Sequence, residues 1–182
     1  MQRIFIGVAV NQVPQRQIND LLKPLTNSNR DIRWVAEQNR HLTLAFLGDQ
    51  PPAVVDALVR SMDEVYRQAS AFHAVFTGLE RFPNSKGNIL ALVCAANERL
   101  VRLFRLTNGL LAKHGLAPEH ETFRAHITVG RIARSGLFKT NINQAAKINL
   151  HIDRITLYQS TLTPTGSVYL ALKATDLLEA EL

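Results

Sequence analysis

Apolar positions recur with two different periods along the chain, one typical of strands and the other of helices. Apolar side chains at every second position predict strands over residues 3–10, 40–47, 72–80, 88–94, 124–129, 148–160 and 168–173. Apolar side chains three and four positions apart predict helices over residues 15–25, 51–69 and 98–114. This order of elements predicts an α+β or mixed α/β fold with mainly antiparallel sheets.

The strand predicted over residues 148–160 changes phase within its length. Its apolar residues have even numbers as far as Ile152 and odd numbers from Ile155 onward. Because side chains alternate between the faces of a sheet, we expect a bulge or a break near Asp153.

One order of parts occurs twice in the sequence. A strand, a helix and a strand that carries His-x-Thr occupy residues 3–47 and again residues 88–130. A weak duplication of this kind predicts two related lobes that face one another. No stretch rich in Pro, Gly or Ser marks a domain boundary, so we expect residues 1–182 to form a single two-lobed domain.

The two His-x-Thr motifs are the strongest chemical signal in the sequence. They contain His41 and Thr43 in the first copy and His126 and Thr128 in the second. Alternation along a strand places the His and the Thr of each motif on one face and their apolar neighbours on the other. If positions are independent, two such motifs with apolar residues after both the His and the Thr arise by chance with a probability of about 0.003.

Strict alternation also assigns a face to the residues beyond each Thr. It places Ala45 and Gly130 on the polar faces, where their small size leaves room for a ligand, and it places Phe46 in the core. Trp34 is a further aromatic side chain that could stack on a base.

Composition and charge narrow the class of protein. The chain has 46% hydrophobic residues, which excludes a disordered chain. It has a single cysteine, Cys94, which excludes an internal disulfide and a cysteine-rich zinc site. No apolar run approaches the roughly 20 residues that span a bilayer, and residues 1–10 are interpreted as a first strand instead of a signal peptide. We therefore expect a cytoplasmic protein with no membrane partner.

The net charge is +6, and 15 of the 21 basic residues are arginine. Ten basic and three acidic residues lie between Arg81 and Lys139, so this segment carries a charge of +7 and the rest of the chain −1. Guanidinium groups pair well with phosphate oxygens, which favours a phosphate-bearing partner. A solvated helix face explains the same charge, and the two interpretations stay open.

Two histidines and two threonines suit acid–base chemistry at phosphorus. Histidine titrates near pH 6.5, so one imidazole of a pair can be neutral while the other is protonated. Such a pair can act as general base and general acid on opposite sides of a phosphorus centre, while the hydroxyls donate to phosphoryl oxygens. The sequence has no His-x-His, no His-Glu-x-x-His and no carboxylate close to either motif, so we expect neither a metal nor a cofactor.

The residues around both motifs resemble a known family. Trp34-Val35 with residues 39–48, and residues 123–131 around the second motif, are similar to the 2H phosphoesterase superfamily, in particular to the bacterial RNA 2′,3′-cyclic phosphodiesterases, long labelled 2′-5′ RNA ligases. The resemblance covers nearly the whole chain. It implies two pseudo-symmetric lobes, each a mainly antiparallel sheet with helices on its outer face, enclosing a central cleft.

The resemblance also implies an activity and a role for each motif residue. The activity is metal-independent hydrolysis of a 2′,3′-cyclic phosphate at an RNA 3′ end to a 2′-phosphate. His126 would activate the water, His41 would protonate the leaving 3′ oxygen, and Thr43 and Thr128 would hold the phosphate oxygens. One departure is Ala125, because the family more often has proline before the second His.

Two arginines are candidates for binding the substrate phosphate. Arg131 matches a basic residue that follows the second motif in the family, but strict alternation places it on the face opposite His126 unless the strand bends after Gly130. Arg124 has the same parity as His126 and so is expected on the face of the motif.

Two alternatives to hydrolysis remain at this point. A 2′-5′ RNA ligase would join 2′,3′-cyclic phosphate and 5′-hydroxyl ends by the same chemistry with an alcohol in place of water. A catalytically silent module would bind RNA ends without turnover, although binding alone does not require two titratable imidazoles. The expected partners are RNA 3′ ends or cyclic nucleotides, and we expect a monomer.

Overall fold

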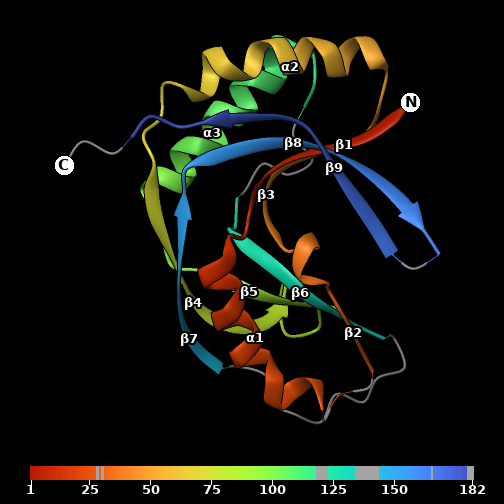
Figure 1. The fold of residues 1–182 in the computed structure, drawn as a ribbon, viewed down its shortest axis with the longest axis vertical. Coiled ribbons are helices and arrows are strands. Elements are labelled where there is room, and N and C mark those ends of the chain that lie inside the picture. The colour runs from red at the N-terminus through yellow and green to blue at the C-terminus, as the bar shows by residue number, and fades with distance from the viewer. Residues whose placement is uncertain (28, 30, 118–122, 134–143, 165, 180–182) are drawn as a thin grey trace.

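The computed structural model describes residues 1–27, 29, 31–117, 123–133, 144–164 and 166–179. Over these residues the chain forms one curled antiparallel sheet with helices packed against one of its faces (Figure 1). The strands are β1 (Gln2–Ala9), β2 (Ile32–Trp34), β3 (His41–Gln50), β4 (Phe72–Phe82), β5 (Ile89–Cys94), β6 (His126–Ile132), β7 (Gln144–Ile152), β8 (Arg154–Thr163) and β9 (Gly166–Asp176). Part of the arginine-rich segment, including Arg134 and Lys139, lies outside the described residues.

The strand order divides the sheet into two matching halves. The order is β7-β4-β5-β6-β3-β1-β8-β9, and β2 pairs with the far end of β6. Counted outward from the contact of β6 with β3, β5 matches β1, β4 matches β8, and β7 matches β9. The predicted α+β fold with two pseudo-symmetric antiparallel lobes is therefore confirmed.

Three helices cover the core face of the sheet. They are α1 (Gln12–Thr26), α2 (Pro52–Tyr66) and α3 (Glu98–Lys113), and most of their buried apolar residues belong to one cluster with those of the strands. The α1 helix follows β1 but packs against β7 of the other lobe, whereas α3 follows β5 and packs against β3. Each lobe is thus completed by a helix from the other part of the sequence.

The predicted break near Asp153 is confirmed, and it has a topological cause. The β7 strand ends at Ile152 and pairs with β4, whereas β8 begins at Arg154 and pairs with β1 and β9. The chain passes from one lobe to the other at Asp153, so the apolar face changes parity there.

Two short elements were not predicted. The β2 strand has three residues, and the 3-10 helix η1 (Glu37–Asn39) follows it immediately before β3. Neither is long enough to show a hydrophobic period. None of the helices in the described ranges is long and apolar enough to cross a membrane.

Candidate active site

One residue pair joins the two lobes between the His-x-Thr motifs. Leu42 of β3 is paired with Ile127 of β6 in an antiparallel register. Because the strands run in opposite directions, His41 lies on the side of Thr128, and Thr43 lies on the side of His126. The structure thus brings the four predicted residues together at the contact between the lobes.

Burial shows which face of the sheet carries these four side chains. Leu42 and Ile127 are fully buried in the core cluster beneath the helices. The His and Thr side chains alternate with them along each strand and are partly exposed on the helix-free face. This arrangement agrees with the alternation that the sequence predicts.

Hydrogen bonds to the backbone orient both imidazoles in the same way. The Nδ1 atom of His41 lies 2.7 Å from the carbonyl oxygen of Asn39, and Nδ1 of His126 lies 2.9 Å from that of Arg124. A carbonyl oxygen can only accept, so each Nδ1 carries a hydrogen and donates it. Proton transfer is therefore assigned to Nε2, the same nitrogen in both motifs.

Aromatic side chains partly bury His41. Its ring lies 4.6 Å from that of Phe5 and meets Tyr169 edge-on at 5.3 Å. Burial lowers the pKa of His41, the hydrogen bond to Asn39 opposes this, and the nearby charge of His126 lowers the pKa further. The free protein thus favours neutral His41, and the two imidazoles are close enough to interact electrostatically.

Phe82 and Arg124 surround His126. The rings of Phe82 and His126 stack at 3.9 Å with 20° between their planes, and the Arg124 guanidinium lies 5.0 Å from the Phe82 ring centre. Arg124 pairs with the carboxylate of Glu80 and donates a 2.7 Å hydrogen bond to the carbonyl oxygen of Pro83. The Arg124 guanidinium is thus held by the protein beside the ring that stacks on His126.

Each motif strand bulges immediately after its Thr. On β3, Thr43 pairs with Gly7 and Ala45 with Ile6, which leaves Leu44 as an extra residue. On β6, Thr128 pairs with Ala91 and Gly130 with Leu90, and the extra residue is Val129. A bulge of this kind inverts the alternation of the side chains beyond it.

The inverted alternation corrects three expectations. Ala45 and Gly130 lie on the core face instead of the motif face, and both are buried. Phe46 lies on the motif face, where the guanidinium of Arg3 is 4.9 Å from its ring centre. Arg131 is exposed on the motif face because the strand bulges at Val129, before Gly130, instead of bending after Gly130 as expected.

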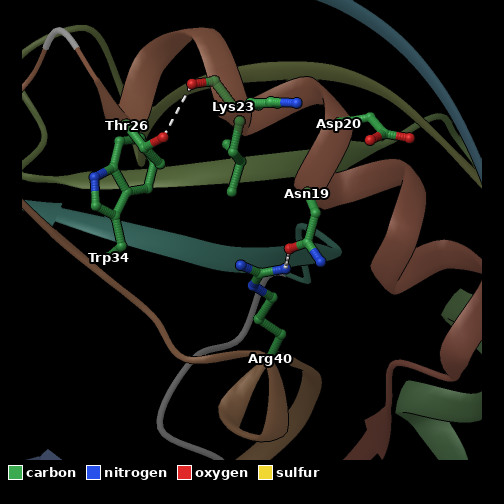
Figure 2. A pocket seen from close by; sticks show the side chains of 7 residues that line it. Asn19, Asp20, Lys23, Thr26, Trp34 and Arg40 are labelled. Carbon is green, nitrogen blue, oxygen red and sulfur yellow. Dashed lines mark hydrogen bonds between the residues drawn. The ribbon is translucent and has the colours of Figure 1, made fainter.

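A cavity of about 290 Å³ lies under α1, on the face of the sheet opposite to the motif residues (Figure 2). It is lined by Asn19, Asp20, Leu22, Lys23, Thr26, Trp34 and Arg40. Arg40 is only 7% exposed and donates to Asn19 at 2.7 Å and to Gln15 at 3.1 Å. Burial lowers the pKa of Arg40, and the charge of Glu37 opposes this. Arg40 therefore ties α1 to the start of β3 and fixes the backbone next to His41.

The surroundings of the motifs include three residues that sequence reasoning missed. Phe82 and Tyr169 contact the imidazoles from strands distant in sequence, so no local pattern identifies them. Arg33 lies opposite Arg131 on β2, a strand too short to predict. Within the described residues, no three His, Cys, Asp or Glu side chains are grouped so as to hold a metal ion.

A two-lobed antiparallel sheet that presents one His-x-Thr from each lobe on a common face is the architecture of a two-histidine phosphoesterase. The chain belongs to the LigT like phosphoesterase family, whose model matches residues 8–93 and again residues 90–169. Each match contains one His-x-Thr motif, in agreement with the internal duplication.

Relatives and solved structures are similar along nearly the whole chain. An RNA 2′,3′-cyclic phosphodiesterase of Thermotoga maritima is 29% identical, covering 92% of this chain and 91% of that protein, and one of Aquifex aeolicus is 29% identical, covering 92% and 93%. A Thermus thermophilus structure superposes with a TM-score of 0.83 at 21% identity, covering 98% of this chain and 100% of that one. E. coli LigT superposes with a TM-score of 0.79 at 22% identity, covers 98% of both chains, and has also been solved with 3′-AMP.

Proposed function

We propose that the protein hydrolyses 2′,3′-cyclic phosphate ends of RNA to 2′-phosphate ends, without a metal, by means of the two His-x-Thr motifs. The observation that carries the proposal is the matched pair of imidazoles on one face, each with Nδ1–H donated to a backbone carbonyl, so that both are oriented in the same way. Membership of the phosphoesterase family and the activity named for the T. maritima relative support it.

In the proposed reaction, each motif histidine moves one proton. Nε2 of His126 accepts a proton from water as the water oxygen bonds to phosphorus. The bond from phosphorus to the 3′ oxygen breaks, and Nε2–H of His41 donates its proton to that oxygen. The products are a 2′-phosphate and a 3′-hydroxyl, so one water is consumed and the second proton transfer balances the first.

The hydroxyls and a cation stabilise the phosphoryl group. Thr43 and Thr128 lie beside the imidazoles on the same face and donate to the non-bridging oxygens, where charge is concentrated. Arg131 lies further along β6 on that face and supplies a positive charge. Arg124 acts through Phe82 on His126 and leaves the phosphate to the other groups.

To act as the acid, His41 must be protonated, whereas the free protein favours its neutral form. Burial lowers the pKa of His41, so its imidazole is mainly neutral before substrate binds. The negative charge of a bound cyclic phosphate acts in the opposite direction and favours the imidazolium. Substrate binding thus helps to protonate the group that the reaction needs as an acid.

Product analysis tests the proposal directly. The pure protein is incubated in EDTA with an RNA oligomer that ends in a 2′,3′-cyclic phosphate, and the terminal phosphate is mapped. We expect a 2′-phosphate with the wild type and none with His126→Ala. A 3′-phosphate, a joined RNA product, or a requirement for added metal would each contradict the proposed function.

A further inference from the structure

Two arginines lie directly opposite each other at the edge of the motif face. Arg33 of β2 is paired with Arg131 of β6, and both side chains are exposed. In the part of the chain that the structure describes, neither guanidinium forms an ion pair or a hydrogen bond with the protein. Like charges opposite each other on neighbouring strands repel, so this pair is destabilising unless an anion binds between or beside them.

Both arginines lie on the same face as the second motif. On β5, Ile89, Ala91 and Val93 alternate regularly, and their partners on β6 are Arg131, Thr128 and His126. Arg33 is the partner of Arg131 on the other side of β6. The four side chains from His126 to Arg33 therefore form one polar row on the helix-free face.

The row leads away from the phosphate site in steps that suit a nucleic-acid chain. From Thr128 to Arg131 the ladder advances two steps of β5, which is about 7 Å along the strand. Arg33 lies beside Arg131 on the neighbouring strand, at a spacing of about 4.8 Å, on the edge of β6 that also carries β3. Arg131 is therefore in line with the second motif and Arg33 with His41 of the first.

The β8–β9 turn leaves space for the guanidinium of Arg33. A Cβ atom added to Gly166 would lie 3.3 Å from Nη2 of Arg33, and Gly166 has a positive φ of 139° that side chains rarely adopt. Glycine at this turn thus leaves room for the Arg33 guanidinium.

We propose, on the basis of the proposed function, that Arg33 binds the phosphodiester on the 5′ side of the terminal nucleotide while Arg131 binds the cyclic phosphate. An RNA chain that ends in a cyclic phosphate can continue only through its 5′ oxygen, so a second cation beside Arg131 is available for the phosphate that follows. A guanidinium can form two parallel hydrogen bonds with phosphate oxygens. The protein is thus built for oligonucleotide ends and accepts cyclic mononucleotides less well.

The test compares three substrates of increasing length. They are adenosine 2′,3′-cyclic phosphate, the same compound with a 5′-phosphate, and a trinucleotide that ends in the cyclic phosphate. For Arg33→Gln we expect KM to rise about tenfold or more for the trinucleotide and for the 5′-phosphorylated compound, with kcat unchanged. For adenosine 2′,3′-cyclic phosphate, neither constant should change.

Salt dependence and matched variants complete the test. The slope of log KM against log salt for the trinucleotide should fall by about 0.7 in Arg33→Gln, as expected for the loss of one single-strand phosphate contact. Arg102→Gln removes an equally exposed arginine from the outer helix α3 and should change nothing. Arg33→Lys should lose part of the effect, because it keeps the charge but not the paired donors.

The possible failures are distinguishable. If the wild type hydrolyses none of the three substrates, the proposed function fails. If it hydrolyses them and Arg33→Gln affects all three equally or none of them, the proposed function stands and the role of Arg33 is overturned.

Discussion

Leu42 and Ile127 face each other across the junction of the two lobes, and neither has any exposed surface. The catalytic candidates are the immediate neighbours of this pair on both strands. Their spacing is therefore fixed by two core side chains on the opposite face of the sheet. A site built on rigid strands in this way holds its geometry without contacts between the polar groups themselves.

Removing either imidazole should abolish most turnover and leave the fold intact. His41→Ala and His126→Ala each remove one proton-transfer group, so we expect kcat to fall by a factor on the order of 10²–10⁴. Circular dichroism and the urea midpoint should stay close to those of the wild type, because neither side chain belongs to the apolar core. Near-normal turnover in either variant would exclude the paired mechanism.

The pH dependence should identify which histidine is the acid. The acid must be protonated, and burial lowers the pKa of His41 in the free protein. As the pH rises, kcat/KM should therefore start to decrease at a pH lower than about 6.5, the ordinary pKa of histidine. The alkaline limb of kcat should lie at higher pH, because bound substrate favours the imidazolium. In His41→Ala the alkaline limb should disappear from the rate profile. Loss of the acidic limb instead would show that His41 is the base and that the roles are reversed.

Arg124 should affect the rate of the chemical step more than substrate binding. Its guanidinium is held by Glu80 and lies over Phe82, which stacks on His126. We expect Arg124→Gln to lower kcat severalfold, with a smaller change in KM, because the guanidinium that packs on Phe82 and so positions His126 is lost. Phe82→Leu should reproduce the effect. An increase in KM alone, with unchanged kcat, would indicate that Arg124 binds the substrate phosphate instead.

A methyl group at Gly7 should disturb the first motif. The Cβ of Gly7→Ala would lie 2.7 Å from the backbone oxygen of Leu42 and 3.5 Å from Cδ2 of His41. Backbone cannot move aside easily, so we expect the free energy of unfolding in urea to fall by about 1–3 kcal/mol, with lower turnover. Gly109→Ala is the matched control, because nothing lies within 4 Å of its Cβ and alanine favours a helix. Equal stability of the two variants would contradict the close contact.

The sequence predicts those features that depend on local pattern. The two motifs follow from the residue identities, and the three helices and the break near Asp153 follow from the hydrophobic period. The bulges at Leu44 and Val129 do not, because an extra residue in a strand is defined only by the partners across the ladder. For this reason the period-2 pattern assigned Phe46 and Arg131 to the core face, and the structure places both on the motif face.

Contacts between distant segments account for the rest. Phe5, Phe82 and Tyr169 pack on the imidazoles from three strands that only the folded sheet brings together. The packing of α1 on β7 and of α3 on β3 likewise has no local signal, since an apolar helix face fits either lobe. The chemistry of the site could thus be predicted, but its supporting residues could not.

The side chains beyond the matched bulges make the site asymmetric, although the backbone that carries it has twofold symmetry. A scaffold with a twofold axis between Leu42 and Ile127 offers the same arrangement of imidazole and hydroxyl to a ligand placed either way round. The two strands also differ five residues after each histidine, because one presents the aromatic ring of Phe46 and the other the guanidinium of Arg131. The duplication supplies the reactive groups in duplicate, and this difference, together with the different neighbours of the two imidazoles, distinguishes two orientations of a ligand that the backbone alone leaves equivalent.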